Sequence, residues 1–179
     1  LAICTALPST SLFSHVAPWM AEAFRSGPEC LRYVFAAENS TTAADQLRHA
    51  VGSFPRTYYL DTVIGKMSKV FTTDESDLPP LVPGFERGHL VEAFNEIYTD
   101  SAPGIDALTI EGLHPKRDLW PFEEAKLYGH NTVHFMLAFL LEQRGAHYMS
   151  EAAGHPDLIE RTRRALLDEC GEALCRKHA

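Results

Sequence analysis

The sequence predicts a mainly α-helical protein that begins with part of an α/β unit. Two observations predict it: apolar strand-like segments alternate with helical ones over residues 1–50, and two long helical patterns fill residues 118–177. Alternation with short turns favours a parallel sheet with crossover helices. Two strands are too few for such a sheet. We therefore expect residues 1–55 to be the remnant of a doubly wound domain, and residues 56–179 to be predominantly helical.

The α/β part consists of two strand–helix units. Strands are expected at 1–7 and 31–36 and helices at 15–24 and 43–51, the second helix being capped by one of the hydroxyl residues at 40–42. No initiator Met and no basic segment precede the first strand, so it is not a signal peptide. We expect a strand that needs neighbours from a larger domain.

The middle of the chain has a weaker pattern. Residues 54–69 have no clean period, 74–84 form an acidic, Pro-rich loop, and 89–98 fit a strand or a helix equally well. Residues 99–118 are expected to be a connector with short extended pieces.

Two helices are expected in the last third of the chain. Asp118 can cap a helix that runs to Arg144 and stops at Gly145, and Asp157 can start a last helix that runs to about Lys177. Residues 135–141 are apolar on every side, which predicts a segment buried in a core.

Composition excludes some partners. The chain has 16 basic and 24 acidic residues, a net charge of −8, which disfavours nucleic-acid binding. No apolar run reaches the roughly 18 residues that a membrane span needs. The four cysteines form no C-x-x-C pair, which favours reduced thiols and a cytoplasmic protein.

The first long helix carries unusual polar residues. At about 100° per residue, Lys126, Asn131 and His134 fall at about 0°, 140° and 80° and share one broad face. A lysine in a buried polar cavity has a lowered pKa, so its neutral amine can act as a base. The alternative is that Lys126 extends to solvent and His134 is a hydrogen-bonded core histidine.

A motif on this helix resembles a known family. Lys126, Asn131 and His134 have the form K-x4-N-x-x-H after a Pro-Phe-Glu-Glu lead-in, and this resembles the catalytic helix of the polyol-specific long-chain dehydrogenases, of the mannitol 2-dehydrogenase and mannitol-1-phosphate 5-dehydrogenase type. Residues 36–39 and 54–64 resemble further family segments in the same order.

The resemblance implies metal-free polyol oxidation with NAD or NADP. Lys126 would be the general base, Asn131 and Asn39 would hold the developing alkoxide, and His134 would orient the same oxygen. Asn39 would also lie at the cofactor, and Asp61 and His130 would bind the substrate. The family relation further implies a Rossmann-type dinucleotide-binding unit at 1–55 and a helical substrate domain at 56–179.

One departure from the family is plain. The sequence has no G-x-G-x-x-G-like turn between a strand and a helix, and this turn would bind the pyrophosphate. Residues 1–179 alone are therefore expected to be inactive. Whether the substrate is a polyol, a polyol phosphate or a sugar acid, which nicotinamide cofactor is used, and the oligomeric state all stay open.

Three alternatives remain. His130 and His134 have the i, i+4 spacing of zinc ligands in a hydrolase, with His147 or His155 as a possible third. The chain could instead be a non-catalytic helical interaction domain. Separately, His114, Lys116 and Arg117 could bind a phosphate group, or could form a solvated loop.

Overall fold

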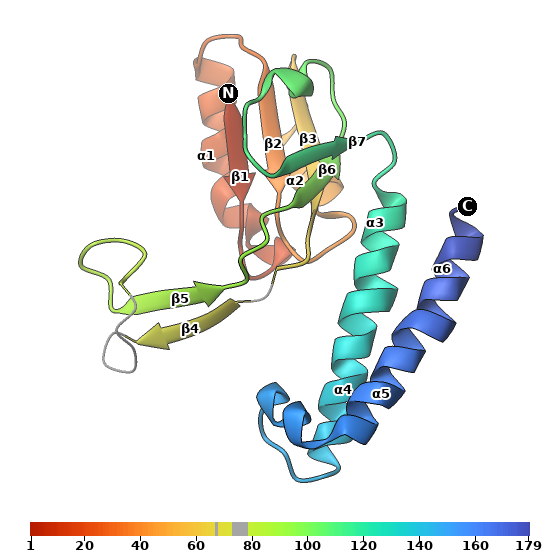
Figure 1. The fold of residues 1–179 in the computed structure, drawn as a ribbon. Helices are drawn as coiled ribbons and strands as arrows, with labels where there is room; N and C mark the ends of the chain where they lie inside the picture. Colours follow the sequence, from red (N-terminus) through yellow and green to blue (C-terminus); the bar gives the residue numbers. More distant parts are fainter. Residues whose placement is uncertain (67, 73–78) are drawn as a thin grey trace.

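The structure is a computed structural model that describes residues 1–66, 68–72 and 79–179. It combines a small, mainly parallel sheet, a two-stranded hairpin and two long helices (Figure 1). The strands are β1 (Ala2–Thr5), β2 (Arg32–Ala36), β3 (Thr57–Ile64), β4 (Ser68–Thr72), β5 (Arg87–Val91), β6 (Ile97–Asp100) and β7 (Leu113–Lys116). The predicted fold class, mainly α with a partial α/β unit, is confirmed.

Helices follow the same pattern. The α-helices are α1 (Phe13–Ser26), α2 (Ala43–Val51), α3 (Trp120–Glu124), α4 (Thr132–Glu142), α5 (Pro156–Arg164) and α6 (Glu172–Lys177). The π-helical segments are η3 (Ala125–Asn131) and η5 (Ala165–Gly171), and the 3₁₀ turns are η1 (Thr10–Leu12), η2 (Ile105–Ala107) and η4 (Met149–Gly154). None of the described helices combines the length and apolar character that a membrane crossing requires.

The five-stranded sheet has the order β1-β2-β3-β6-β7. Strands β1, β2 and β3 are parallel, with α1 and α2 as the crossovers, while β6 runs antiparallel to β3 and parallel to β7. Both predicted strands and both predicted helices of the first 51 residues are confirmed. Residues 54–69, which showed no period, supply β3, and this strand extends the sheet.

Both faces of β2 are covered, which explains why four of its five residues are apolar or aromatic. Val34 and Ala36 pack with Phe13 of α1 and Leu47 of α2 on one face. On the other face, Tyr33 and Phe35 pack with Leu60 and Ile105, and the Tyr33 hydroxyl donates to the Pro103 carbonyl at 2.7 Å. The packing on both faces fixes the position of β2 and of the turn that follows it at the carboxyl edge of the sheet.

The ambiguous stretch 89–98 contains strand and no helix: it holds most of β5 and the start of β6, with residues 92–96 between them outside regular secondary structure. The expected connector 99–118 holds short pieces, β7 and the turn η2, as predicted. Part of the predicted loop, 74–78, lies outside the described residues, and 79–84 has no regular secondary structure.

Two long helices lie side by side as an antiparallel pair (Figure 1). Segments α3, η3 and α4 form the first, and α5, η5 and α6 form the second. Asp118 caps the first helix, its Oδ1 accepting from the Trp120 N–H at 3.1 Å, and Gly145, with φ of 78°, follows its end. The predicted limits of both helices are confirmed to within two residues.

The predicted burial of 135–141 is wrong for most of that segment. Leu141 is 3% exposed, but Phe135 is 74% and Phe139 53% exposed. The reason is that a single neighbour, the second long helix with its η4 turn, packs against α4 and covers only the side that carries Leu137, Leu140 and Leu141. An all-round apolar pattern shows what a helix could bury, not how many partners it has.

Candidate active site

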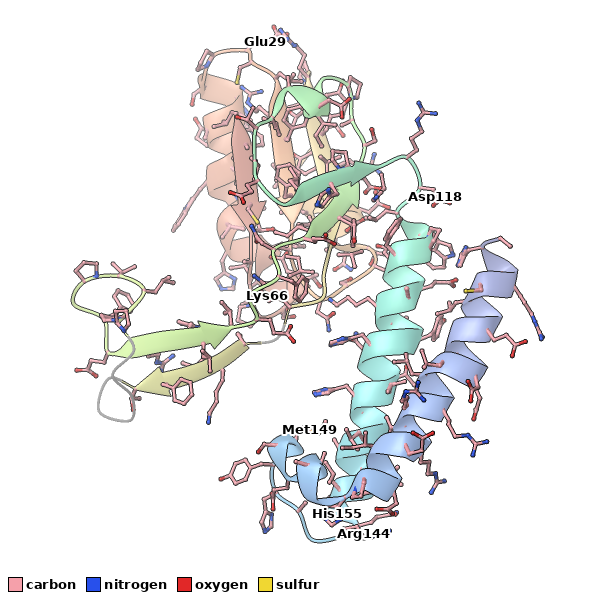
Figure 2. All side chains as sticks on the ribbon, viewed as in Figure 1. Glu29, Lys66, Asp118, Arg144, Met149 and His155 are labelled. Carbon is pink, nitrogen blue, oxygen red and sulfur yellow. The ribbon has the colours of Figure 1, made fainter. Side chains whose placement is uncertain are left out.

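A pocket of about 270 Å³ lies where the carboxyl edge of the parallel strands meets the first long helix. Three segments line it: the turn after β2, the end of β3, and the α3–η3 stretch of the helix. The lining residues are Glu38, Asn39, Ser40, Thr41, Thr62, Val63, Glu123, Lys126, Leu127 and Asn131. In Figure 2 the helix starts beside Asp118 and leads away from the sheet toward Arg144.

Lys126 and Asn39 meet in this pocket although 87 residues separate them. The Lys126 ammonium donates to Asn39 Oδ1 at 3.0 Å. Lys126 is half-buried, and this burial lowers its pKa because a charged amine loses solvation. A larger fraction of the amine is therefore neutral near neutral pH, as a general base requires.

The π-helical segment explains how Asn131 shares the pocket. A π-helix bonds residue i to residue i+5, so side chains five apart lie on one face in successive turns. Lys126 and Asn131 are five apart within η3, and both line the pocket. An α-helix would have placed them about 140° apart. Here the wider turn places both side chains on the wall of the pocket.

His134 is not brought to the pocket. Eight residues beyond Lys126, it lies about 12 Å farther along an ideal helix axis, and its ring faces that of His130, the two centroids being 6.0 Å apart. His130 instead lines a second pocket of about 230 Å³, which shares Val63 and Lys126 with the first. Its other lining residues are Gly65, Phe94, Glu96, Tyr98, Phe122 and Ala125.

Asp61 caps helix α2 rather than lining the pocket. Its Oδ1 accepts from the Ala44 N–H at 2.8 Å, while Thr42, at the expected N-cap position, makes no side-chain cap bond. The hydroxyl residues at 40–42 were thus the wrong cap. Burial raises the pKa of Asp61, opposed by its bond from Ala44. Its predicted contact with a substrate hydroxyl stays a prediction.

Two pocket carboxylates were missed by the sequence analysis. Glu38 is buried and accepts from the Thr5 hydroxyl at 3.0 Å and from the Leu7 N–H at 2.9 Å, so it ties the turn after β2 to the end of β1. Burial, followed by repulsion from Asp61, Asp100 and Asp118, raises the pKa of Glu123 to about 7. The sequence could have indicated Glu123 as a pocket residue, because it precedes Lys126 by three residues and so lies on the same helix face.

The proposed phosphate cluster is partly engaged elsewhere. The Lys116 ammonium lies 5.0 Å and 4.8 Å from the ring centroids of Tyr98 and Phe122, and the His114 ring lies 5.8 Å from that of Tyr98. Lys116 and His114 thus contact aromatic rings that line the second pocket. The phosphate-binding role of His114, Lys116 and Arg117 stays a prediction.

The pocket lies at the edge of the sheet where a doubly wound domain would bind a ligand. Asn39 and the turn after β2 lie at the carboxyl edge of parallel strands, where doubly wound sheets bind ligands. No glycine-rich turn for a pyrophosphate occurs in the sequence. Among the residues that the structure describes, no group of three or more His, Cys, Asp and Glu side chains is arranged to hold a metal ion.

The structure combines a partial α/β unit with a helical hairpin, and a pocket lies between them at the carboxyl edge of the sheet. Mannitol-1-phosphate 5-dehydrogenase of Arthrobacter sp. (strain FB24) is 30% identical to the chain over 183 aligned positions, which cover 98% of the chain and 46% of that protein. Mannitol-1-phosphate 5-dehydrogenase of Halalkalibacterium halodurans is 30% identical over 144 positions, 77% of the chain and 37% of that protein. No family model matches the chain.

The chain belongs to the polyol-specific long-chain dehydrogenase family, as its helix motif predicted. It spans less than half the length of these two curated relatives.

Proposed function

We propose that the chain carries the catalytic residues of an NAD(P)-dependent oxidoreductase that interconverts a polyol, polyol phosphate or sugar acid and its keto form. The contact of Lys126 with Asn39 in the pocket is the observation that carries this proposal. Residues 1–55 would be the end of the dinucleotide-binding domain and 56–179 the substrate domain. The two relatives are named for mannitol 1-phosphate, so a hexitol phosphate is the first substrate to test.

In the oxidation direction, Lys126 as the neutral amine takes the proton of the substrate hydroxyl. Because Asn39 Oδ1 accepts from Lys126, the amide nitrogen of Asn39 is the atom available to donate to the developing alkoxide, and Asn131 supplies a second amide donor. A nicotinamide ring, when bound, supplies the acceptor for the hydride that leaves the carbinol carbon. No metal is needed in this scheme, because the amine and the amides stabilise the oxygen.

The rest of the substrate would reach the second pocket. That pocket joins the first at Val63 and Lys126 and offers His130 and Glu96 as polar groups beside aromatic rings. This position supports the predicted role of His130 in substrate binding. His134 would act from farther along the helix, and its role depends on a substrate long enough to reach it.

The first test is turnover at the reduced-nicotinamide absorbance band. Mannitol, arabinitol, sorbitol, mannitol 1-phosphate and altronate would be offered with NAD or NADP to a longer form of the protein that carries a glycine-rich turn, and to residues 1–179 alone. We expect Lys126→Ala to lower kcat by about 10²–10⁴, the usual contribution of general base catalysis. Lys69→Ala, on the remote hairpin, is the matched control and should keep full activity.

Three outcomes would contradict parts of the proposal. Activity that a chelator abolishes would favour the zinc hydrolase alternative. A folded protein that turns over none of the five substrates with either cofactor would favour the non-catalytic interaction domain. Ordinary turnover by residues 1–179 alone would disprove the expected need for a glycine-rich turn.

A further inference from the structure

Beside the pocket, one buried carboxylate joins the two long helices. Glu124 is 3% exposed. Its Oε1 accepts from the Lys177 ammonium at 2.6 Å, and its Oε2 lies 2.7 Å from His178 Nε2. Lys177 and His178 follow Glu124 by 53 and 54 residues and lie at the very end of the last helix, as the position of the C-terminus beside α3 shows (Figure 1).

Lys177 is held by a second contact on the same helix. Its ammonium lies 5.8 Å from the Trp120 ring, and Trp120 precedes Glu124 by four residues, one turn along the same face. The Lys177 ammonium thus lies between the Trp120 ring and the Glu124 carboxylate. The hydrogen bond from Lys177, followed by that from His178, lowers the pKa of Glu124 despite its burial.

The helical hairpin has fixed points at both ends. At the connected end, the chain itself and the Arg144–Asp157 pair, at 2.8 Å and exposed, hold the helices together. At the open end, next to the pocket, no turn joins the two helices. There the contacts of Glu124 with Lys177 and His178 connect them. Between these ends the two π-helical segments face each other, since a β-carbon on Gly129 would lie 3.6 Å from Leu166 Cδ1.

Glu124 and Lys126 are two residues apart, so they project to different sides of one helix. Glu124 faces the last helix, and Lys126 faces Asn39 at the sheet. Fixing one side of a helix fixes its rotation, and the rotation sets where the other side points. Glu124 also directly precedes the π-helical segment that puts Asn131 beside Lys126.

We propose that Glu124 is a positioning residue: by binding Lys177 and His178 it fixes the rotation of the helix that presents Lys126 and Asn131 to the pocket. This inference rests on the proposed function, in which Lys126 is the base. Glu124 does not line the pocket, so it acts through Lys126 and Asn131 rather than on the substrate.

The test measures the Lys126 amine directly. The rate of acylation of Lys126 by an amine reagent would be followed against pH by mass spectrometry of its peptide in the purified protein. In the parent protein the labelling profile should show a lowered pKa. In Glu124→Gln it should move toward that of an exposed lysine, and kcat should fall at least 10-fold with KM changed less than 3-fold. Glu124→Asp should restore part of both.

Two further variants keep the test decisive. Arg144→Ala breaks the ion pair at the other end of the same helices and should leave the Lys126 profile unchanged. If Glu124→Gln does not fold, Lys177→Met, which removes one exposed partner and leaves His178 in place, should still shift the profile in the same direction.

The outcomes separate the two proposals. A lowered pKa in the parent that neither Glu124→Gln nor Lys177→Met changes would overturn the positioning role and leave the base assignment intact. An ordinary lysine profile in the parent would instead overturn the base assignment itself.

Discussion

At the residue scale, the oxygen and the nitrogen of the Asn39 amide can make different contacts in the pocket. Its oxygen accepts from Lys126, so the lysine is oriented by a residue that the sheet holds in place. Lys126 stands on a helix that meets the sheet at its edge, and this bond fixes the amine over the end of β2. The amide nitrogen of Asn39 can still donate a hydrogen bond, and the proposed function assigns this bond to a substrate oxygen.

The raised pKa of Glu123 makes the free energy of unfolding of the protein depend on pH. The pKa of Glu123 is about 7 in the folded protein against an ordinary 4.5, so the folded state binds a proton more tightly than the unfolded state. Stability should therefore fall as pH rises from about 4.5 to about 7. Glu123→Gln, which cannot ionise, should melt at the parent temperature at pH 4.5 and above it at pH 8.

Glu142→Gln is the matched control for that experiment, because Glu142 is an exposed carboxylate on α4 away from the pocket. It should show no such gain at pH 8. Equal melting temperatures for Glu123→Gln and the parent at both pH values would refute the raised pKa. Differential scanning calorimetry or circular dichroism at each pH supplies the measurement.

Residue patterns predicted the polar side of the site only in part. Lys126, Asn131 and Asn39 were found because a motif and a strand end marked them, and the structure brings them together. His134 was placed with them on angle alone, and its distance along the helix axis separates it. Asp61 could not be recognised as the cap of α2, because the two are neighbours only once β2 and β3 have paired.

At the element scale, turn geometry holds the added strands in the sheet. Gly112 has φ of 78°, and its carbonyl accepts from the Ile97 N–H at 2.7 Å, which starts the pairing of β6 with β7. A β-carbon at Gly112 would lie 2.2 Å from the Asn95 carbonyl oxygen, so this close approach excludes a side chain.

Gly112→Ala should therefore destabilise the protein by at least about 2 kcal/mol, from backbone strain plus displacement of the Asn95 segment. Gly145→Ala is the control, since Gly145 has the same φ of 78° but no atom within 4 Å of an added β-carbon. It should lose only about 1 kcal/mol of left-handed strain. Denaturant unfolding of both variants measures the difference, and equal losses would contradict the steric argument.

Elements with a local signal were predictable, and those that depend on partners were not. The mainly apolar segments of β1 and β2, and the Asp118 cap of the first long helix, depend on residues that are close together in the sequence. Strand β3 mixes Tyr, Thr and Asp, and six of its eight residues are neither fully buried nor fully exposed, so it shows no alternation. The π-helical segments have no local signature, although Gly129 marks where the helices approach closely.

At the scale of the whole molecule, the site exists only because distant parts meet. The turn after β2, the end of β3, and the helix that follows β7 form the pocket. Lys177 and His178, near the C-terminus, bind that helix through Glu124. A change at the C-terminus should therefore reach the pocket, whereas a change on the projecting β4–β5 hairpin should not (Figure 1).

The apolar side of α4 shows the limit of reading burial from hydropathy. Phe135 and Phe139 are 74% and 53% exposed in a segment that the sequence predicts to be buried. Since exposed side chains contribute little to folding, Phe135→Ser with Phe139→Ser should change the free energy of unfolding by no more than about 0.5 kcal/mol for each residue. Removal of exposed apolar area should also reduce self-association, measured by light scattering.

Leu141→Ala, on the covered side of the same helix, is the contrast. Leu141 is 3% exposed and packs with Ala152 and Leu158, so its truncation should cost about 2–5 kcal/mol. If the serine pair instead lowered stability as much as Leu141→Ala, the two phenylalanines would be covered in solution, and the burial predicted from the sequence would hold for the molecule after all. A small loss with less self-association would establish α4 as a helix that packs on one side and is exposed on the other.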